Sequence, residues 1–181
     1  MNPGMNPGMN PSMVPKEEWG SPNPKAPPEL ARFAFLIGRW RCVAKVRMES
    51  GEWQSFEGAW LGRYILDGFV IADEYRMTGP AGELLVLGLN LRSYEAARQR
   101  WHIKWISGLS GAWTDLGLEE LGGIRFSVQS VTYVFKEPMM EHALTRATYA
   151  NISAGHFTWR GESSEDGKSW KPFMVVECDR A

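Results

Sequence analysis

Alternation of apolar and polar residues dominates the chain from about residue 40 to its end. Runs in which every second side chain is apolar are typical of strands with one buried face. Turn residues separate these runs, among them Asp67-Gly68 and Gly122-Gly123, which suit the positive φ angles of tight hairpins. The pattern predicts about ten strands, at residues 40–49, 53–66, 69–77, 83–92, 99–106, 112–121, 124–135, 142–152, 156–163 and 172–180.

The connections between the predicted strands are short, and no long helical pattern lies between them. This argues against parallel βαβ units and favours an antiparallel up-and-down meander. A meander of this length closes into a barrel or splits into two sheets, because open edges invite aggregation. We therefore expect an all-β fold with a single antiparallel up-and-down barrel, and a two-sheet sandwich is the alternative.

The region before the first strand has a different pattern. Leu30, Phe33 and Ile37 share one face at helical spacing, and Gly38 follows them, which predicts a short helical turn. Earlier still, a Met-Asn-Pro-Gly motif repeats and Pro and Gly dominate. Such a segment buries too little apolar surface to offset its ordering entropy. We expect residues 1–27 to be a flexible tail and residues 28–181 to be the barrel domain; an arm docked on a partner subunit is the alternative for the tail.

Composition narrows the function classes. The formal net charge is -1 with no basic excess, so no nucleic-acid partner is expected. No run reaches the roughly 18 apolar residues of a membrane span, and the first residues do not resemble a secretory signal. We expect a cytoplasmic protein in which Cys42 and Cys178 are reduced thiols. The expected partner is a small apolar molecule rather than nucleic acid or membrane, and a homodimer is left open.

Gly38-Arg39-Trp40 opens the first long strand, and Arg180 ends the last one. This pattern resembles the lipocalin (calycin) signature, in which the guanidinium packs across the indole and plugs the closed end of the barrel. Further segments are Phe-Leu-Ile-Gly-Arg-Trp at 35–40, Tyr-Ile-Leu-Asp-Gly at 64–68, Phe-Thr-Trp-Arg at 157–160 and Ser-Glu-Asp-Gly-Lys-Ser-Trp at 164–170. Together they resemble a bacterial family of lipocalin-like barrels, most of unknown function. The resemblance covers residues 30–181 and implies the fold, but it brings no catalytic residues.

The resemblance has a geometric consequence. In a barrel with an even number of strands, the first and last strands pair antiparallel. If Trp40 lies opposite Arg180, then Cys42 lies opposite Cys178, and Ala44 lies opposite Val176. Directly opposed residues have Cβ atoms about 4.5–5.5 Å apart. We predict that the two cysteines are close together and reduced, as small residues filling a narrow seam; a redox switch is the alternative.

Strand alternation indicates which side chains face the interior. Trp101 and Trp105 share an inward face, Asp73 and Tyr75 share another, and Trp113 and Asp115 share a third. An inward aspartate is costly unless it is paired, so Asp73 or Asp115 needs a donor, which Arg146, Tyr75 or a ligand would supply. A structural ion pair without function is the alternative. The candidate ligand-binding residues are Asp73, Tyr75, Trp101, Trp105, Trp113, Asp115 and Arg146.

Other motifs add little chemistry. Residues 164–170 resemble a single Asp-box, which we interpret as a turn held by Asp166. His102, His142 and His156 lack the spacing of a zinc motif, so neither a metal nor a cofactor is expected; a histidine that binds haem is the alternative. No nucleophile motif or phosphate loop occurs, which leaves open whether the protein is an enzyme.

The leading hypothesis is that the barrel binds a small hydrophobic ligand in an aromatic-lined cavity. One alternative is a cofactor-free lyase, isomerase or cyclase, with Asp73 as general base and Tyr75 or Arg146 holding an oxyanion. The other alternative is an interaction module whose lumen is filled by side chains, for which the nine Trp residues would suffice.

Overall fold

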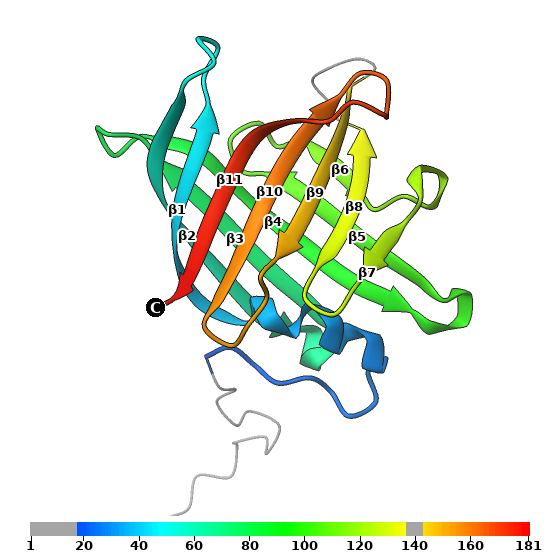
Figure 1. The fold of residues 1–181 in the computed structure, drawn as a ribbon. Helices are drawn as coiled ribbons and strands as arrows, with labels where there is room; N and C mark the ends of the chain where they lie inside the picture. Colours follow the sequence, from blue (N-terminus) through cyan, green and yellow to red (C-terminus); the bar gives the residue numbers. More distant parts are fainter. Residues whose placement is uncertain (1–17, 137–142) are drawn as a thin grey trace, which may run out of the picture.

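A computed structural model describes residues 18–136 and 143–181. They form an antiparallel sheet of eleven strands that curls into a barrel, as predicted (Figure 1). The strands are β1 (Gly38–Arg47), β2 (Trp53–Ile65), β3 (Val70–Thr78), β4 (Leu84–Glu95), β5 (Arg100–Ser107), β6 (Trp113–Leu116), β7 (Ile124–Phe126), β8 (Val131–Lys136), β9 (Leu144–Ala150), β10 (His156–Ser164) and β11 (Lys171–Arg180).

One predicted strand is in fact two. Residues 124–135 form β7 and β8, because the backbone N–H of Ser127 donates to the carbonyl of Ser130 (2.9 Å) and closes a turn between them. This turn contains neither Gly nor Pro, so the two strongest sequence signals of a turn are missing.

The strands pair in the order β6-β5-β4-β3-β2-β1-β11-β10-β9-β8-β7. Because every pair is antiparallel, β6 and β7 run in the same direction and cannot continue the pattern. Among the described strands these two end the ladder, and β6 packs beside β8 instead. The barrel wall is therefore a curled sheet whose ends meet through side chains.

The pairing of the first and last strands has the predicted register, although the strand number is odd rather than even. The break between β6 and β7 absorbs the odd strand, so β1 and β11 still run antiparallel. The opposed residues are Trp40 with Arg180, Cys42 with Cys178 and Ala44 with Val176.

Arg180 covers Trp40 at the lower end of the barrel. Its Cζ lies 4.1 Å from the centroid of the Trp40 ring. The guanidinium also donates to the carbonyl of Ala154 (Nε, 2.8 Å) and to that of Ile37 (Nη1, 3.1 Å). Gly38 has a φ of +117°, and a Cβ there would lie 2.5 Å from Nη1, so this position requires glycine. The stacking implied by the lipocalin resemblance is present.

A 3-10 helix, η1 (Pro28–Leu36), covers the same end of the barrel (Figure 1). It buries Leu30, Phe33 and Leu36. The buried face includes Leu36 instead of the predicted Ile37 because a 3-10 helix repeats every three residues. The carbonyl of Leu36 accepts the Nε1–H of Trp40 at 3.0 Å, which ties the helix to the first strand.

Residues 18–27 run along the outside of the β2–β3 turn. The carbonyl of Trp19 accepts the backbone N–H of Tyr64 (2.8 Å), and the backbone N–H of Asn23 donates to Gly68 (3.2 Å). This contact segment lies on the tail side of the predicted boundary at residue 28. The repeats at residues 1–17 lie outside the described residues. No helix in the described part of the chain is long and apolar enough to span a bilayer.

Candidate ligand-binding cavity

A cavity of about 340 Å³ lies inside the barrel and is lined by residues of the strands and of the β5–β6 turn. Ser110 and Ala112 of the β5–β6 turn are exposed and lie at its mouth. Seven strands contribute its aromatic lining, which comprises Trp60, Tyr75, Trp105, Tyr133, Phe135, Tyr149, Trp159 and Phe173. Polar contacts come from hydroxyls and from the amide of Asn90, and no charged side chain of the described residues lines the space. Apolar concavities with a few placed polar groups are the usual form of a small-molecule site.

Below the cavity lies an ion pair between Asp73 and Arg92, and neither side chain has exposed surface. The Nε of Arg92 donates to Oδ1 of Asp73 at 2.5 Å, and its Nη2 donates to Oδ2 at 3.2 Å. Burial is the largest single influence and lowers the pKa of Arg92. The charge and hydrogen bond of Asp73, together with Tyr149 and Tyr133, raise it, and the net pKa is well above the usual value. The guanidinium of Arg92 is therefore charged in the folded protein.

This ion pair orients three side chains of the cavity wall. Oδ2 of Asp73 accepts hydrogen bonds from Nε1 of Trp60 (3.1 Å) and from Nδ2 of Asn90 (2.8 Å). The Nη2 of Arg92 donates to the hydroxyl of Tyr149 (2.9 Å). Since Trp60, Asn90 and Tyr149 all line the cavity, the buried charges fix the rotamers of its floor.

The donors to Asp73 are therefore Arg92, Trp60 and Asn90, and the prediction that Arg146 or Tyr75 donates to it is wrong. Arg146 points out of the barrel, where its Nη2 lies 2.7 Å from Oε2 of Glu162 and its Cζ lies 4.5 Å from the ring centroid of Trp170. The sequence signal that could have found Arg92 is its alternation with Asn90 on the leucine-rich strand β4.

The other predicted residues on β3 and β5 face the interior. Tyr75 and Trp105 line the cavity. Trp101 lies outside the lining and packs toward η1, with its ring centroid 5.0 Å from that of Phe33. His102 and Lys104 are exposed on the opposite face of β5, which confirms the predicted alternation there.

The predicted inward face of β6 is wrong. Trp113 is 55% exposed, and Asp115 forms an ion pair with Lys104 at 2.7 Å on the outer surface. Trp113 lies directly opposite Ile106, and opposed residues project from the same side of a sheet. The residues of β6 that line the cavity are Thr114 and Leu116.

Two buried polar atoms have no hydrogen-bond partner among the described residues: the hydroxyl of Tyr75 and Nη1 of Arg92. The Tyr75 hydroxyl lies against Gly58, where an added Cβ would be 3.3 Å away. Burial raises the pKa of Tyr75 far above its usual value. Its hydroxyl is therefore a neutral group with a proton to donate.

Cys42 and Cys178 are buried, and their Sγ atoms lie 2.8 Å apart, which confirms that they are close. Both are free thiols in the structure. Burial, followed by the hydrogen bond to Cys42, raises the pKa of Cys178. A thiol held in its protonated form is a weak nucleophile, and neither cysteine lines the cavity.

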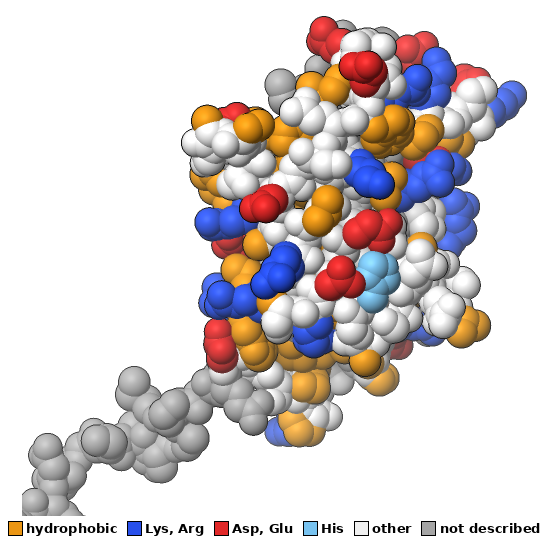
Figure 2. All heavy atoms as spheres, turned by 60° about the vertical axis from the view of Figure 1, so that its left-hand side comes forward, with side chains coloured by type: hydrophobic (Ala, Val, Ile, Leu, Met, Phe, Trp, Pro, Cys, Tyr) orange, Lys and Arg blue, Asp and Glu red, His pale blue; other side chains and the backbone are white. Residues whose placement is uncertain are grey.

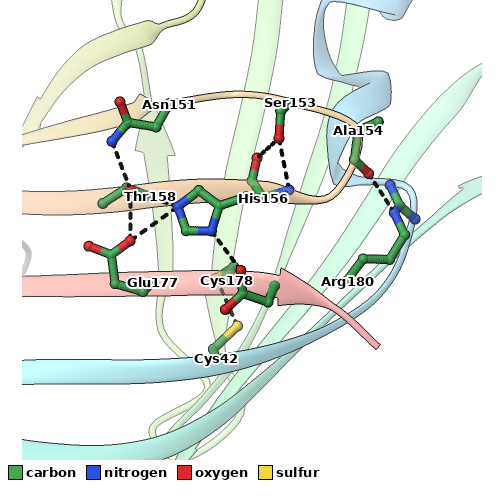
Figure 3. A network of polar contacts seen from close by, with 10 residues as sticks. Cys42, Asn151, Ser153, Ala154, His156, Thr158, Glu177, Cys178 and Arg180 are labelled. Carbon is green, nitrogen blue, oxygen red and sulfur yellow. Dashed lines mark hydrogen bonds and ion pairs between the residues drawn. The ribbon is translucent and has the colours of Figure 1, made fainter.

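The described histidines lie on the outer surface. Nδ1 of His156 lies 2.8 Å from Oδ1 of Asp179, and its Nε2 lies 3.2 Å from Oε2 of Glu177 (Figure 3). His102 pairs with Glu95 (3.0 Å). His142 lies outside the described residues. Within residues 18–136 and 143–181, no three His, Cys, Asp or Glu side chains are grouped so that they could hold a metal ion.

The outer wall in Figure 2 carries acidic and basic side chains interspersed with apolar ones, without a large area of one sign. The Asp-box segment forms the β10–β11 turn. Oδ1 of Asp166 accepts the backbone N–H groups of Lys168 (2.8 Å) and Ser169 (2.7 Å) and the hydroxyl of Ser164 (3.0 Å). These backbone bonds lower the pKa of Asp166, as expected for a turn device.

No curated protein matches this chain. Its fold is similar to that of Rv2717c from M. tuberculosis, with a TM-score of 0.60 at 8% identity over 86% of this chain and 99% of the other. It is also similar to the S-type phycobiliprotein lyase CPES from Guillardia theta, with a TM-score of 0.53 at 10% identity over 84% and 92% of the two chains. At these identities the likeness is one of fold alone. A family of proteins of unknown function, DUF1579, matches residues 26–180, so this chain belongs to the DUF1579 family.

Proposed function

We propose that this barrel binds a small, uncharged, apolar molecule in its central cavity. The observation that carries the proposal is the space of about 340 Å³ with aromatic walls inside the barrel. Aromatic side chains that remain unpacked around a space leave apolar surface for a ligand to bury.

The size and charge of the space narrow the ligand. Its volume is at the low end of the roughly 300–1,000 Å³ of known ligand pockets, which suits a compact ring system. The described lining has no charged side chain, and the charges of Asp73 and Arg92 compensate each other below the floor. A charged ligand would lose its hydration without gaining a partner, so a neutral ligand is favoured.

The two alternatives have less support. An interaction module with a filled lumen would leave no space of this volume. The enzyme alternative uses Asp73 as general base, but this carboxylate has no exposed surface and already accepts from Trp60, Asn90 and Arg92. A buried, fully hydrogen-bonded carboxylate cannot reach a substrate proton.

Titration calorimetry with neutral bicyclic aromatic compounds tests the proposal. Ala112→Trp places a large side chain at the exposed mouth of the cavity, and Ala81→Trp places the same side chain on the exposed β3–β4 turn as a matched control. We expect one-to-one binding with a negative heat-capacity change in the wild type and in Ala81→Trp, and affinity about tenfold lower or worse in Ala112→Trp.

Two results would overturn the proposal together. One is the absence of saturable binding by any neutral aromatic compound in the panel. The other is a bare protein mass when the chain is purified from its native host and examined by native mass spectrometry. Equal affinity of the wild type and Ala112→Trp would place the binding site elsewhere on the molecule.

A further inference from the structure

The floor of the cavity carries a hydrogen-bond acceptor with a fixed direction. Asn90 lines the cavity and is only 4% exposed. Its Nδ2 donates to Oδ2 of Asp73 at 2.8 Å. A carboxylate only accepts hydrogen bonds, so the amide must present its NH₂ group to Asp73. The carbonyl oxygen Oδ1 therefore lies on the side away from Asp73, where the cavity is.

The surrounding network prevents the amide from turning over. A flipped Asn90 would bring Oδ1 against the carboxylate, where two oxygen atoms with partial or full negative charge repel each other. Asp73 itself is held by Arg92 through both of its oxygens and by Nε1 of Trp60. The acceptor is thus preorganised before any ligand arrives.

Within the described residues, no side chain or backbone group donates to Oδ1 of Asn90, although Asn90 is a buried residue. The hydroxyls of the wall differ from it, because Thr114, Thr145 and Tyr149 can rotate a proton toward an acceptor or away from it. Among the lining residues that the structure describes, Asn90 is the one that combines a fixed direction with acceptor-only chemistry toward the cavity.

We infer that the cavity selects neutral aromatic molecules that carry an N–H or O–H group, such as phenols and N–H heteroaromatics, with that donor placed on Oδ1 of Asn90. This inference rests on the proposed ligand binding. An isosteric molecule without the donor removes water from Oδ1 and returns no hydrogen bond, and a site built to pair a polar group discriminates against the analogue that lacks it.

Matched ligand pairs test the inference on the unmodified protein. Indole is compared with indene, and 2-naphthol with 2-methylnaphthalene, by titration calorimetry, with each affinity corrected for the partition of the compound between water and an apolar solvent. We expect the donor-bearing member of each pair to bind about tenfold more tightly after this correction.

Two variants test whether Asn90 causes the preference for donor-bearing ligands. Asn90→Leu keeps the branched shape of the side chain and leaves Asp73 with Arg92 and Trp60, and we expect it to lose the tenfold preference. Thr114→Val changes another buried polar residue of the wall and is expected to retain the preference. If both members of each pair bind the wild type equally well, the inference is wrong and the ligand-binding proposal stands. If neither member binds saturably, both fail, and the wild-type comparison decides this even where Asn90→Leu does not fold.

Discussion

Arg92 on β4 and Asp73 on β3 form an ion pair at 2.5 Å in which neither side chain has any exposed surface. Removing one partner of such a pair leaves an uncompensated charge in the interior. We therefore expect Arg92→Met to lower the free energy of unfolding by about 3–5 kcal/mol, measured by urea unfolding at neutral pH.

The double variant Asp73→Asn/Arg92→Met removes both charges and is expected to be more stable than Arg92→Met alone. The control is the exposed pair of Arg76 and Glu74, at 2.8 Å, where Arg76→Met is expected to change stability by less than about 1 kcal/mol. A double variant as unstable as the single one would show that lost packing, and not an orphaned charge, causes the effect.

Arg180 should contribute to stability through its stacking on Trp40 at 4.1 Å and its two bonds to backbone carbonyls. We expect Arg180→Ala to cost about 2 kcal/mol. Arg180→Lys should recover only part of this, because an ammonium lacks the planar fork. Thermal unfolding measures both, with the exposed Arg41→Ala on the same pair of strands as the control. Full recovery by lysine would contradict a role for the planar group.

Cys178 should make the protein less stable at alkaline pH. Its pKa is raised in the folded state by burial and then by the bond to Cys42. The folded state therefore holds the thiol proton more tightly than the unfolded chain, whose cysteine pKa is about 8.5. This contribution is complete below that pH and is lost as pH rises above it.

For one proton, the slope is about 1.4 kcal/mol per pH unit. Urea unfolding between pH 7 and 10 should show a steeper decline for the wild type than for Cys178→Ala, which has no group to titrate at this position. Parallel declines in the two proteins would be inconsistent with a raised pKa at Cys178.

Asp166 should make the protein less stable at acidic pH. Its pKa is lowered by the backbone N–H groups of Ser169 and Lys168 and then by the hydroxyl of Ser164. Its contribution to stability is therefore present above the ordinary aspartate pKa of about 4 and is lost as pH falls through the lower folded value. The melting temperature of Asp166→Asn should change less than that of the wild type between pH 4 and about 2. A direct NMR titration of the Asp166 carboxyl would refute the account if its pKa were ordinary.

The register between β1 and β11 could be predicted from the sequence. One anchored pair, Trp40 with Arg180, sets all other pairs of an antiparallel ladder, and Cys42 and Cys178 followed from it. The inward face of β5 also followed from alternation alone, because the strand is long and regular.

The partner of Asp73 could not be predicted from the sequence in this way, because the pairing of Asp73 depends on an irregularity of the backbone. A β-bulge between Met77 and Thr78 shifts the pairing of β3 and β4 by one residue. Without it, Asp73 would face Leu89; with it, Asp73 faces Asn90 and shares a side of the sheet with Arg92. A shift of one residue changes which face every side chain occupies, and residue types alone do not reveal it.

Trp113 shows a different limit. A large apolar residue suggests a buried face. However, although buried residues are mostly apolar, many apolar residues also lie on the surface. The β5–β6 turn sets Trp113 opposite Ile106 on the outside. The length of that turn, rather than the chemistry of the indole, determines which face of β6 carries Trp113.

The strand order has a consequence for how the chain folds. Every pairing in the described ladder joins neighbours in sequence, except the one between β1 and β11. That single pairing brings together segments at opposite ends of the domain. The entropic cost of closing this long loop therefore arises before the contacts between the two strands form. A circularly permuted chain that began at β7 and ended at β6 would build the same wall entirely from local hairpins. The natural order thus places one long-range closure in the middle of an otherwise local sheet, on the seam that holds Trp40, Cys42 and their partners.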